Sequence, residues 1–150
     1  MKLILPSDLR ARIEQESRAS FPRECCGLIE GERFGGTARA LALHPARNIA
    51  PARDRFEIDP RDHFAALKAA RAKDRVLIGC YHSHPGGQAA PSATDLAGAG
   101  EEDFLWLVAA LNAADGPLTL AGFVYSAASF FPVELILGAD LVTSSAKPRG

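Results

Sequence analysis

The chain has 150 residues, 47% of them hydrophobic and 23% charged, and its formal net charge is −1. This length and composition are typical of one globular domain with a core of its own. The near-neutral charge argues against a nucleic-acid or anionic-membrane partner. The apolar start is interrupted at Pro6, too early for a secretory signal, and no later stretch is long enough to span a membrane. Three cysteines, an odd number, do not form a disulfide framework and favour a reducing cytoplasm.

The first half of the chain alternates strand and helix patterns. A short strand at 3–5 precedes turn and capping residues, and a helix is expected over 9–20 with Leu9 and Ile13 on its inner face. Further strands are expected at 25–30, 37–43 and 56–58, the first two joined by a Gly-Gly turn. Asp59-Pro60 opens a helix over 60–73 that should bury Phe64, Leu67 and several alanines.

The second half is richer in strands. The apolar run 76–81 predicts a buried strand, and further strands are expected at 104–111, 118–125 and 129–137. Pro132 indicates a sheet edge or a bulge in the last of these strands. Strands mixed with two or three helices predict an α/β or α+β domain over 1–138, and the small polar residues of 139–150 predict a flexible C-terminal tail.

Two histidines follow the buried run 76–81 directly. Side chains on a strand alternate between faces, so His82 and His84 should point the same way and Ser83 the other way. A loop then leads to the opening turn of a short helix, which brings Asp95 back towards the two imidazoles. Two nitrogens and one carboxylate oxygen, with a fourth tetrahedral position left open, have the composition of a catalytic zinc site.

Simpler interpretations of these residues also fit. Ser92 and Asp95 have the spacing of a helix N-cap with an acidic third residue, with no metal involved. His44 has no partner at ligand spacing and should have a surface or hydrogen-bonding role, and His63 should be structural or exposed. Cys80 lies inside the apolar run and is better read as a buried hydrophobic residue than as a fourth ligand.

Two segments together resemble the JAMM/MPN+ (Mov34/MPN) metalloprotease family, in its compact bacterial single-domain type. The histidine segment is similar to the family signature, and an upstream segment resembles the family's Glu-x-Cys-Gly motif, which carries the catalytic glutamate. The resemblance extends over about residues 3–137. The matching residues are His82-x-His84-Pro85, then Ser92-x-x-Asp95, and upstream Glu24-Cys25-Cys26-Gly27.

The resemblance implies a fold, a cofactor and roles for individual residues. JAMM domains have a curved mixed β-sheet flanked by helices, similar to the cytidine deaminase architecture. The family's pattern implies Zn²⁺ on His82, His84 and Asp95, Glu24 as general base, and Ser92 as hydrogen-bond donor to the developing oxyanion. Cys25 and Cys26 would then be packing residues beside the site.

The resemblance also implies substrates and partners. The family cleaves amide or isopeptide bonds after the C-terminal glycine of ubiquitin or ubiquitin-like proteins, and bacterial relatives act on small sulfur-carrier proteins. A substrate of either kind is therefore expected, and a homodimer is a further expectation because family members often dimerise. Only eight residues separate Asp95 from Phe104, which leaves no room for a long linkage-selecting insertion, so we expect no selectivity among polyubiquitin linkages.

Three other functions remain open. The chain could be a non-catalytic MPN scaffold for protein assembly, although such scaffolds have lost metal ligands and this chain has kept the whole pattern. A zinc-dependent nucleobase deaminase would need His-x-Glu and Pro-Cys-x-x-Cys segments, and the sequence has neither. A thiol hydrolase that uses Cys25 or Cys26 with a histidine is conceivable but weakly supported.

Overall fold

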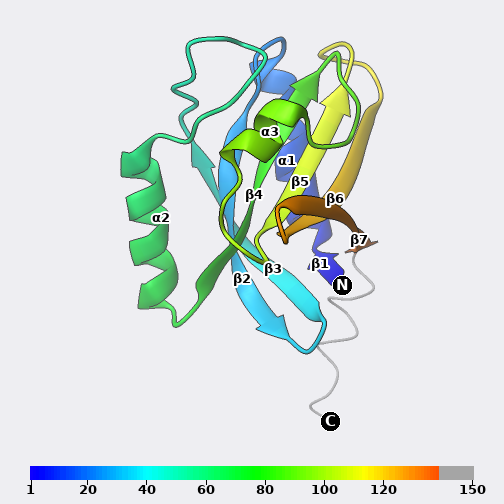
Figure 1. The fold of residues 1–150 in the computed structure, drawn as a ribbon. Coiled ribbons are helices and arrows are strands. Elements are labelled where there is room, and N and C mark those ends of the chain that lie inside the picture. Colours follow the sequence, from blue (N-terminus) through cyan, green and yellow to red (C-terminus); the bar gives the residue numbers. More distant parts are fainter. Residues whose placement is uncertain (139–150) are drawn as a thin grey trace.

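The computed structural model describes residues 1–138, which form one sheet with three helices around it (Figure 1). The elements in chain order are β1 (Lys2–Leu5), α1 (Ser7–Ser20), β2 (Cys26–Phe34), β3 (Thr37–Ala46), α2 (Pro60–Ala72), β4 (Val76–Pro85), α3 (Ala93–Gly98), β5 (Leu105–Leu111), β6 (Leu118–Ser126) and β7 (Ser129–Leu137). The mixed α/β character expected from the sequence is confirmed. The tail expected over 139–150 lies outside the described residues.

The sheet closes on itself, in the order β1-β3-β2-β4-β5-β6-β7, because β1 pairs with β3 on one side and with β7 on the other. Both of these pairings are parallel, as is the pairing of β4 with β5, and the remaining pairings are antiparallel. A curved mixed sheet was expected, but its closure into a barrel was not. The likeness to cytidine deaminases stays a prediction.

Buried side chains gather in two clusters on opposite faces of the central strands. One cluster contains Leu9 and Ile13 of α1, as expected, packed with strand residues such as Leu105 and Leu107. The other contains Ala66 and Ala70 of α2, packed with Leu28, Cys80 and Trp106. Figure 1 shows α2 along one flank of the sheet and α1 behind it. The metal motif lies on the α2 face, because Cys80 precedes the histidines on the same side of β4.

The expectation that α2 buries Phe64 is wrong. Phe64 is 62% exposed, and Lys68 lies over its ring with its ammonium nitrogen 5.6 Å from the ring centroid. Ala66 and Ala70, one turn apart, form the face that packs on the sheet, and on a helix Phe64 points away from that face. The small alanines let α2 approach the strands closely, and Leu67 at the margin is partly buried.

One other expectation is corrected by the strand boundaries. The strand expected at 56–58 is a loop that makes a single β-bridge, between Asn48 and Ile58. The strand predicted from the apolar run 76–81 extends to Pro85, so both histidines lie on β4, as the expected alternation of their side chains requires. Pro132 pairs with β6 on one side only, because β1 pairs with β7 only from Glu134 onwards. Its local position at a sheet edge suits a residue without an N–H to donate. Within residues 1–138, no helix is long and apolar enough to cross a membrane.

Candidate metal centre

The two histidines project from the same face of β4. His82 and His84 are buried, with exposed fractions of 0% and 8%, and their Nε2 atoms lie 2.9 Å apart. Ser83 between them points the other way, where its hydroxyl accepts a hydrogen bond from the Cys25 amide. The alternation expected from the sequence is therefore confirmed, and it needs only the regular pleat of one strand.

Asp95 reaches the histidines from the first turn of α3. Its Oδ2 atom accepts the Ser92 N–H at 2.8 Å, and the Ser92 hydroxyl accepts the Asp95 N–H at 3.0 Å, so the two residues form a capping box. The N-cap interpretation is thus correct. The same Oδ2 atom also lies 3.0 Å from His82 Nε2 and 3.1 Å from His84 Nε2. The capping hydrogen bonds fix the carboxylate where it faces the imidazoles. The same contacts therefore cap α3 and hold Asp95 beside the two histidines.

The three converging atoms suit a metal ion. His82 Nε2, His84 Nε2 and Asp95 Oδ2 form a triangle with sides of 2.9–3.1 Å. Zinc binds such nitrogen and oxygen donors at about 2.0–2.2 Å. Two donors bound to one zinc ion are therefore separated by a distance similar to the sides of this triangle. Two imidazoles and one carboxylate are also the donor types that catalytic zinc sites use. The donor set therefore fits a zinc ion.

The charge states of these side chains follow from burial and mutual contact. Burial lowers the pKa of His82 and so favours the neutral ring, which is the form that binds metals. Burial also acts on Asp95, but hydrogen bonds with both histidines hold the pKa of its carboxyl well below the usual range. His84 Nδ1 donates to the Gln88 carbonyl at 2.9 Å, which leaves Nε2 free to face the centre. His82 Nδ1 is buried and has no partner among the described residues.

Glu24 stands immediately before β2, next to the histidines. One carboxylate oxygen of Glu24 and the ring nitrogens of His82 and His84 all lie within 4.8 Å of one another. Glu24 is 6% exposed, and its Oε1 atom is buried without a hydrogen-bond partner in the part of the chain that the structure describes. Burial raises the pKa of Glu24 to about 7, with His84 opposing part of that shift. Glu24 lies beside the triangle that Asp95 forms with the two histidines, and with the same histidines it makes a second group that could hold a metal ion.

Two aromatic side chains that the sequence interpretation did not assign to the site pack on His82. The ring of Phe56 stacks on His82 with centroids 4.4 Å apart, and Trp106 meets both rings edge-on. Phe56 is the lone aromatic residue in the polar stretch Arg53–Glu57. This isolated position was the one feature of the sequence that could have indicated a role for Phe56 in the site. Trp106 lies on β5, paired with Cys80, and no sequence pattern connects it with the site.

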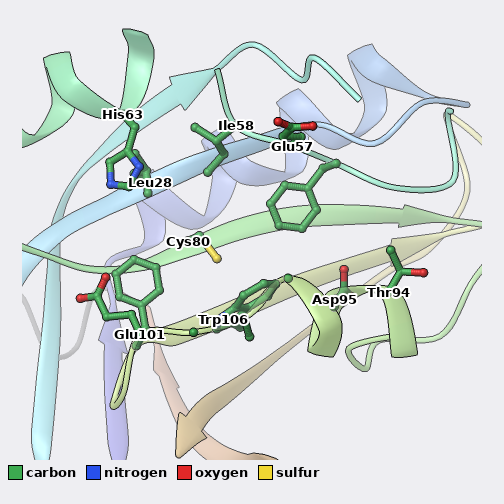
Figure 2. A pocket seen from close by; sticks show the side chains of 14 residues that line it. Leu28, Glu57, Ile58, His63, Cys80, Thr94, Asp95, Glu101 and Trp106 are labelled. Carbon is green, nitrogen blue, oxygen red and sulfur yellow. The ribbon is translucent and has the colours of Figure 1, made fainter. Parts of the chain in front are cut away.

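An apolar cavity of about 330 Å³ adjoins the centre at Asp95 (Figure 2). It lies between the loop before α2 and the segment that runs from α3 to β5. Figure 2 shows Leu28 and Cys80 at its floor, with Trp106 beside Asp95. Its apolar lining is completed by Phe56, Ile58 and Phe104, and its polar lining includes Glu57, His63 and Glu101. The cavity is suited to an apolar side chain placed close to the reacting centre.

The remaining histidines and cysteines supply none of the three donor atoms. His44 hydrogen-bonds buried Glu30 at 2.8 Å, as its predicted role allowed, and His63 is exposed on α2, where it lines the cavity. All three cysteines are buried free thiols. Burial raises the pKa of each thiol, to about 12 for Cys26. Raised thiol pKa values oppose the thiolate that a cysteine nucleophile requires, so they argue against a thiol hydrolase.

Known proteins resemble this chain over most of its length. A desampylase of Haloferax volcanii is 32% identical over 112 residues, which are 71% of this chain and 79% of that protein. A CysO-cysteine peptidase of Mycobacterium tuberculosis is 29% identical over 101 residues, 67% of this chain and 68% of its own. A solution structure of a Desulfitobacterium hafniense protein superposes with a TM-score of 0.81 at 27% identity, covering 90% of this chain and 92% of that one.

The chain also matches a family model over more than half of its length. Residues 6–120 match Prok-JAB, the family of prokaryotic homologs of the JAB domain, and this range contains both motif segments and α1 to β5. The expectation of a compact prokaryotic JAMM/MPN enzyme is confirmed by this match and by the two peptidase relatives. The chain belongs to the prokaryotic JAB-domain family.

Proposed function

We propose that this protein is a zinc-dependent hydrolase that cleaves the amide bond after the C-terminal glycine of a ubiquitin-like or sulfur-carrier protein. The observation that carries the proposal is the convergence of His82, His84 and Asp95, with the unpartnered Glu24 carboxylate beside them. The relatives support the substrate class, since one is a desampylase and another a CysO-cysteine peptidase. The reducing cytoplasm is the compartment that we propose.

The zinc ion would be held by His82 Nε2, His84 Nε2 and Asp95 Oδ2. When bound, it supplies a Lewis acid and lowers the pKa of a water molecule from 15.7 towards about 7. Glu24 would accept the proton of that water on its carboxylate and return it to the departing amine. A pKa of about 7 suits both steps, because a group that titrates near the working pH can take up and release a proton with little loss.

Ser92 would contribute its hydroxyl hydrogen. Its oxygen already accepts the Asp95 N–H, so the O–H remains available to donate to the oxyanion that develops on the scissile carbonyl. Ser92 is exposed, so an arriving substrate can reach this residue from solvent. Removing such a donor from an enzyme costs about 2.7–4 kcal/mol of transition-state stabilisation.

The apolar cavity beside Asp95 would receive the substrate's tail. A glycine at the scissile bond has no side chain of its own to bind, so recognition has to come from the residues that precede it. Phe56, Ile58 and Trp106 offer an apolar wall for one such side chain. We therefore place the residues before the C-terminal glycine in this cavity, with their backbone leading to the zinc site.

The scaffold alternative is disfavoured by the intact donor set. A protein that only mediates assembly has no use for a buried carboxylate oxygen that lacks a partner among the described residues, such as Glu24 Oε1, because it costs folding free energy. Neither the deaminase signature nor an activated thiol is present among the described residues. Hydrolysis by a metal-activated water is the function for which the Glu24 and histidine arrangement is best suited.

The test has two stages. Metal content is measured by plasma mass spectrometry for wild type and for a His82→Ala/His84→Ala variant, and about one zinc per chain is expected in wild type alone. Ubiquitin-like and sulfur-carrier proteins that carry a lysine or cysteine adduct at their C-terminal glycine are then offered as substrates. Zinc-free wild type that cannot be reloaded would overturn the proposal, and so would zinc-loaded protein that cleaves none of these adducts.

A further inference from the structure

The loop between β3 and α2 is fastened at its base by one side chain, Asn48. The loop leaves β3, passes through Phe56 and returns at Ile58, which forms a β-bridge with Asn48. The Asn48 Oδ1 atom accepts the amide hydrogens of Ala50 and Glu57, each at 3.0 Å. The loop is therefore tied at its beginning and at its end to the same oxygen.

The amide nitrogen of the same side chain reaches in two directions. Asn48 Nδ2 donates to the Arg55 carbonyl at 3.1 Å, within the loop, and to the Glu24 carbonyl at 3.0 Å, outside it. A carboxamide has two N–H donors and an oxygen that accepts two hydrogen bonds, so all four positions of Asn48 are used. An aspartate could replace the acceptors but would have no donor for the Glu24 carbonyl or for the Arg55 carbonyl, although the Oδ1 bonds to Ala50 and Glu57 could remain.

The Glu24 carbonyl belongs to a peptide group that is held at both ends. Its oxygen accepts from Asn48, and its N–H, on Cys25, donates to the Ser83 hydroxyl at 2.8 Å. Ser83 also donates its own N–H to the Cys25 carbonyl at 3.1 Å and lies between the two histidines on β4. Because a peptide group is planar, these two anchors fix its orientation, and with it the direction in which the Glu24 side chain leaves the backbone.

The inner oxygen of the Glu24 carboxylate, Oε1, is buried and has no hydrogen-bond partner among residues 1–138. The position of this atom therefore depends on the backbone and on packing. The loop that Asn48 fastens is also part of the centre, since Phe56 stacks on His82. The Asn48 side chain thus connects the loop whose Phe56 covers His82 to the backbone of Glu24.

We propose that Asn48 is a positioning residue for the reaction: it locks the loop that carries Phe56 and the peptide group of Glu24 into one unit. The inference rests on the role proposed above for Glu24. Freed from Asn48, the peptide group can rotate, and the Glu24 carboxylate loses its fixed place beside the histidines. A misplacement of about 1 Å can reduce a rate about 100-fold.

The test compares Asn48→Asp with Asn48→Ala, using Asn112→Ala as the matched control, since Asn112 is exposed in the turn after β5. Zinc content and KM are expected to stay within about two-fold of wild type in the Asp variant, while kcat falls about 10- to 100-fold. The Ala variant should lose at least as much kcat and also show a raised KM, because its loop is freed as well. The control should match wild type in all three quantities.

Amide hydrogen exchange supplies a readout that does not depend on activity. In Asn48→Asp the amides of Ala50 and Glu57 should stay protected and that of Cys25 should exchange faster, whereas in Asn48→Ala all three should exchange faster. An unchanged Cys25 amide in both variants would overturn the coupling. Faster exchange with an unchanged kcat would overturn the positioning role. If wild type cleaves no adduct, the proposed function fails, and the exchange rates still decide whether Asn48 holds the Glu24 peptide.

Discussion

Replacing Glu24 with glutamine should stabilise the metal-free protein and abolish turnover. The Glu24 carboxyl is 6% exposed, and burial raises its pKa from 4.5 to about 7. Each pKa unit corresponds to about 1.4 kcal/mol, so ionising this carboxyl in the folded protein costs about 3 kcal/mol. Glutamine has nearly the same shape and cannot ionise, and the variant should therefore avoid this cost.

The stability difference should depend on pH in one direction. Below pH 4.5 the carboxyl is protonated in both the folded and the unfolded chain, and wild type and variant should be equally stable. Between pH 4.5 and about 7 the unfolded chain releases the proton while the folded protein keeps it, so wild type loses stability as the pH rises. Above pH 7 the variant should be more stable by the full amount, about 3 kcal/mol.

Urea unfolding of chelator-treated wild type and Glu24→Gln, from pH 4 to pH 8.5, measures this difference. The same two proteins loaded with zinc are assayed for cleavage, where loss of a general base should lower kcat by about 10²- to 10⁴-fold. Zinc content should be equal, because Glu24 lies outside the donor triangle. A pH-independent stability difference would refute the argument from burial, and wild-type activity in the variant would refute the role of Glu24.

Three further predictions concern the donor set, the thiols and a buried ion pair. Asp95→Asn removes the charge shared by both imidazoles, so bound zinc and activity should both be lost, and zinc retained at wild-type level by mass spectrometry would contradict the ligand assignment. Iodoacetamide should leave activity unchanged because the thiols are buried with raised pKa values, whereas a chelator should abolish it until zinc is restored; inactivation by alkylation would revive the thiol mechanism. Arg75→Met removes the 2.9 Å partner of Glu30, a side chain that is 1% exposed, and should cost about 3 kcal/mol at pH 7 by urea unfolding. Burial opposes the charge of Glu30, but hydrogen bonds from His44 and Arg75 lower the pKa of its carboxyl. The stability cost of Arg75→Met should therefore shrink as the pH falls below 4.5. A cost that stays constant with pH would count against the pairing of Arg75 with Glu30.

The donor triangle could be predicted from the sequence because its geometry is local. His82 and His84 are two residues apart on a strand, and Ser92 and Asp95 are three apart at a helix start, so standard backbone geometry sets the direction of each side chain. Only the meeting of the two segments needs tertiary structure. Glu24 is different: nothing in its own surroundings distinguishes it, and the family pattern alone indicated its importance.

The parts that could not be predicted depend on contacts distant in the sequence. Asn48 is one asparagine in an irregular stretch, and the sequence around it does not mark it. Its proposed role depends on the hydrogen bond to the Glu24 carbonyl, which can form only after β2 and β3 have paired. The burial of Phe64 was predicted wrongly because the sequence of a helix that contains many alanines does not reveal which of its faces packs on the sheet. Closure of the sheet was equally hidden, since the four residues of β1 carry no signal that they pair on both sides.

That closure has a consequence for how the protein is made. Among the strands of residues 1–138, β1 is synthesised first, yet residues 2–5 pair with residues 134–137 of β7, the strand of this set that is synthesised after all the others. Contacts so far apart in sequence form late, after the entropy of closing the intervening chain has been overcome. All the residues of the candidate centre, from Glu24 to Asp95, are therefore synthesised while β1 still lacks its β7 neighbour. An unpaired strand edge of this kind attracts other chains, so the nascent protein should depend most on chaperones just before its last strand emerges.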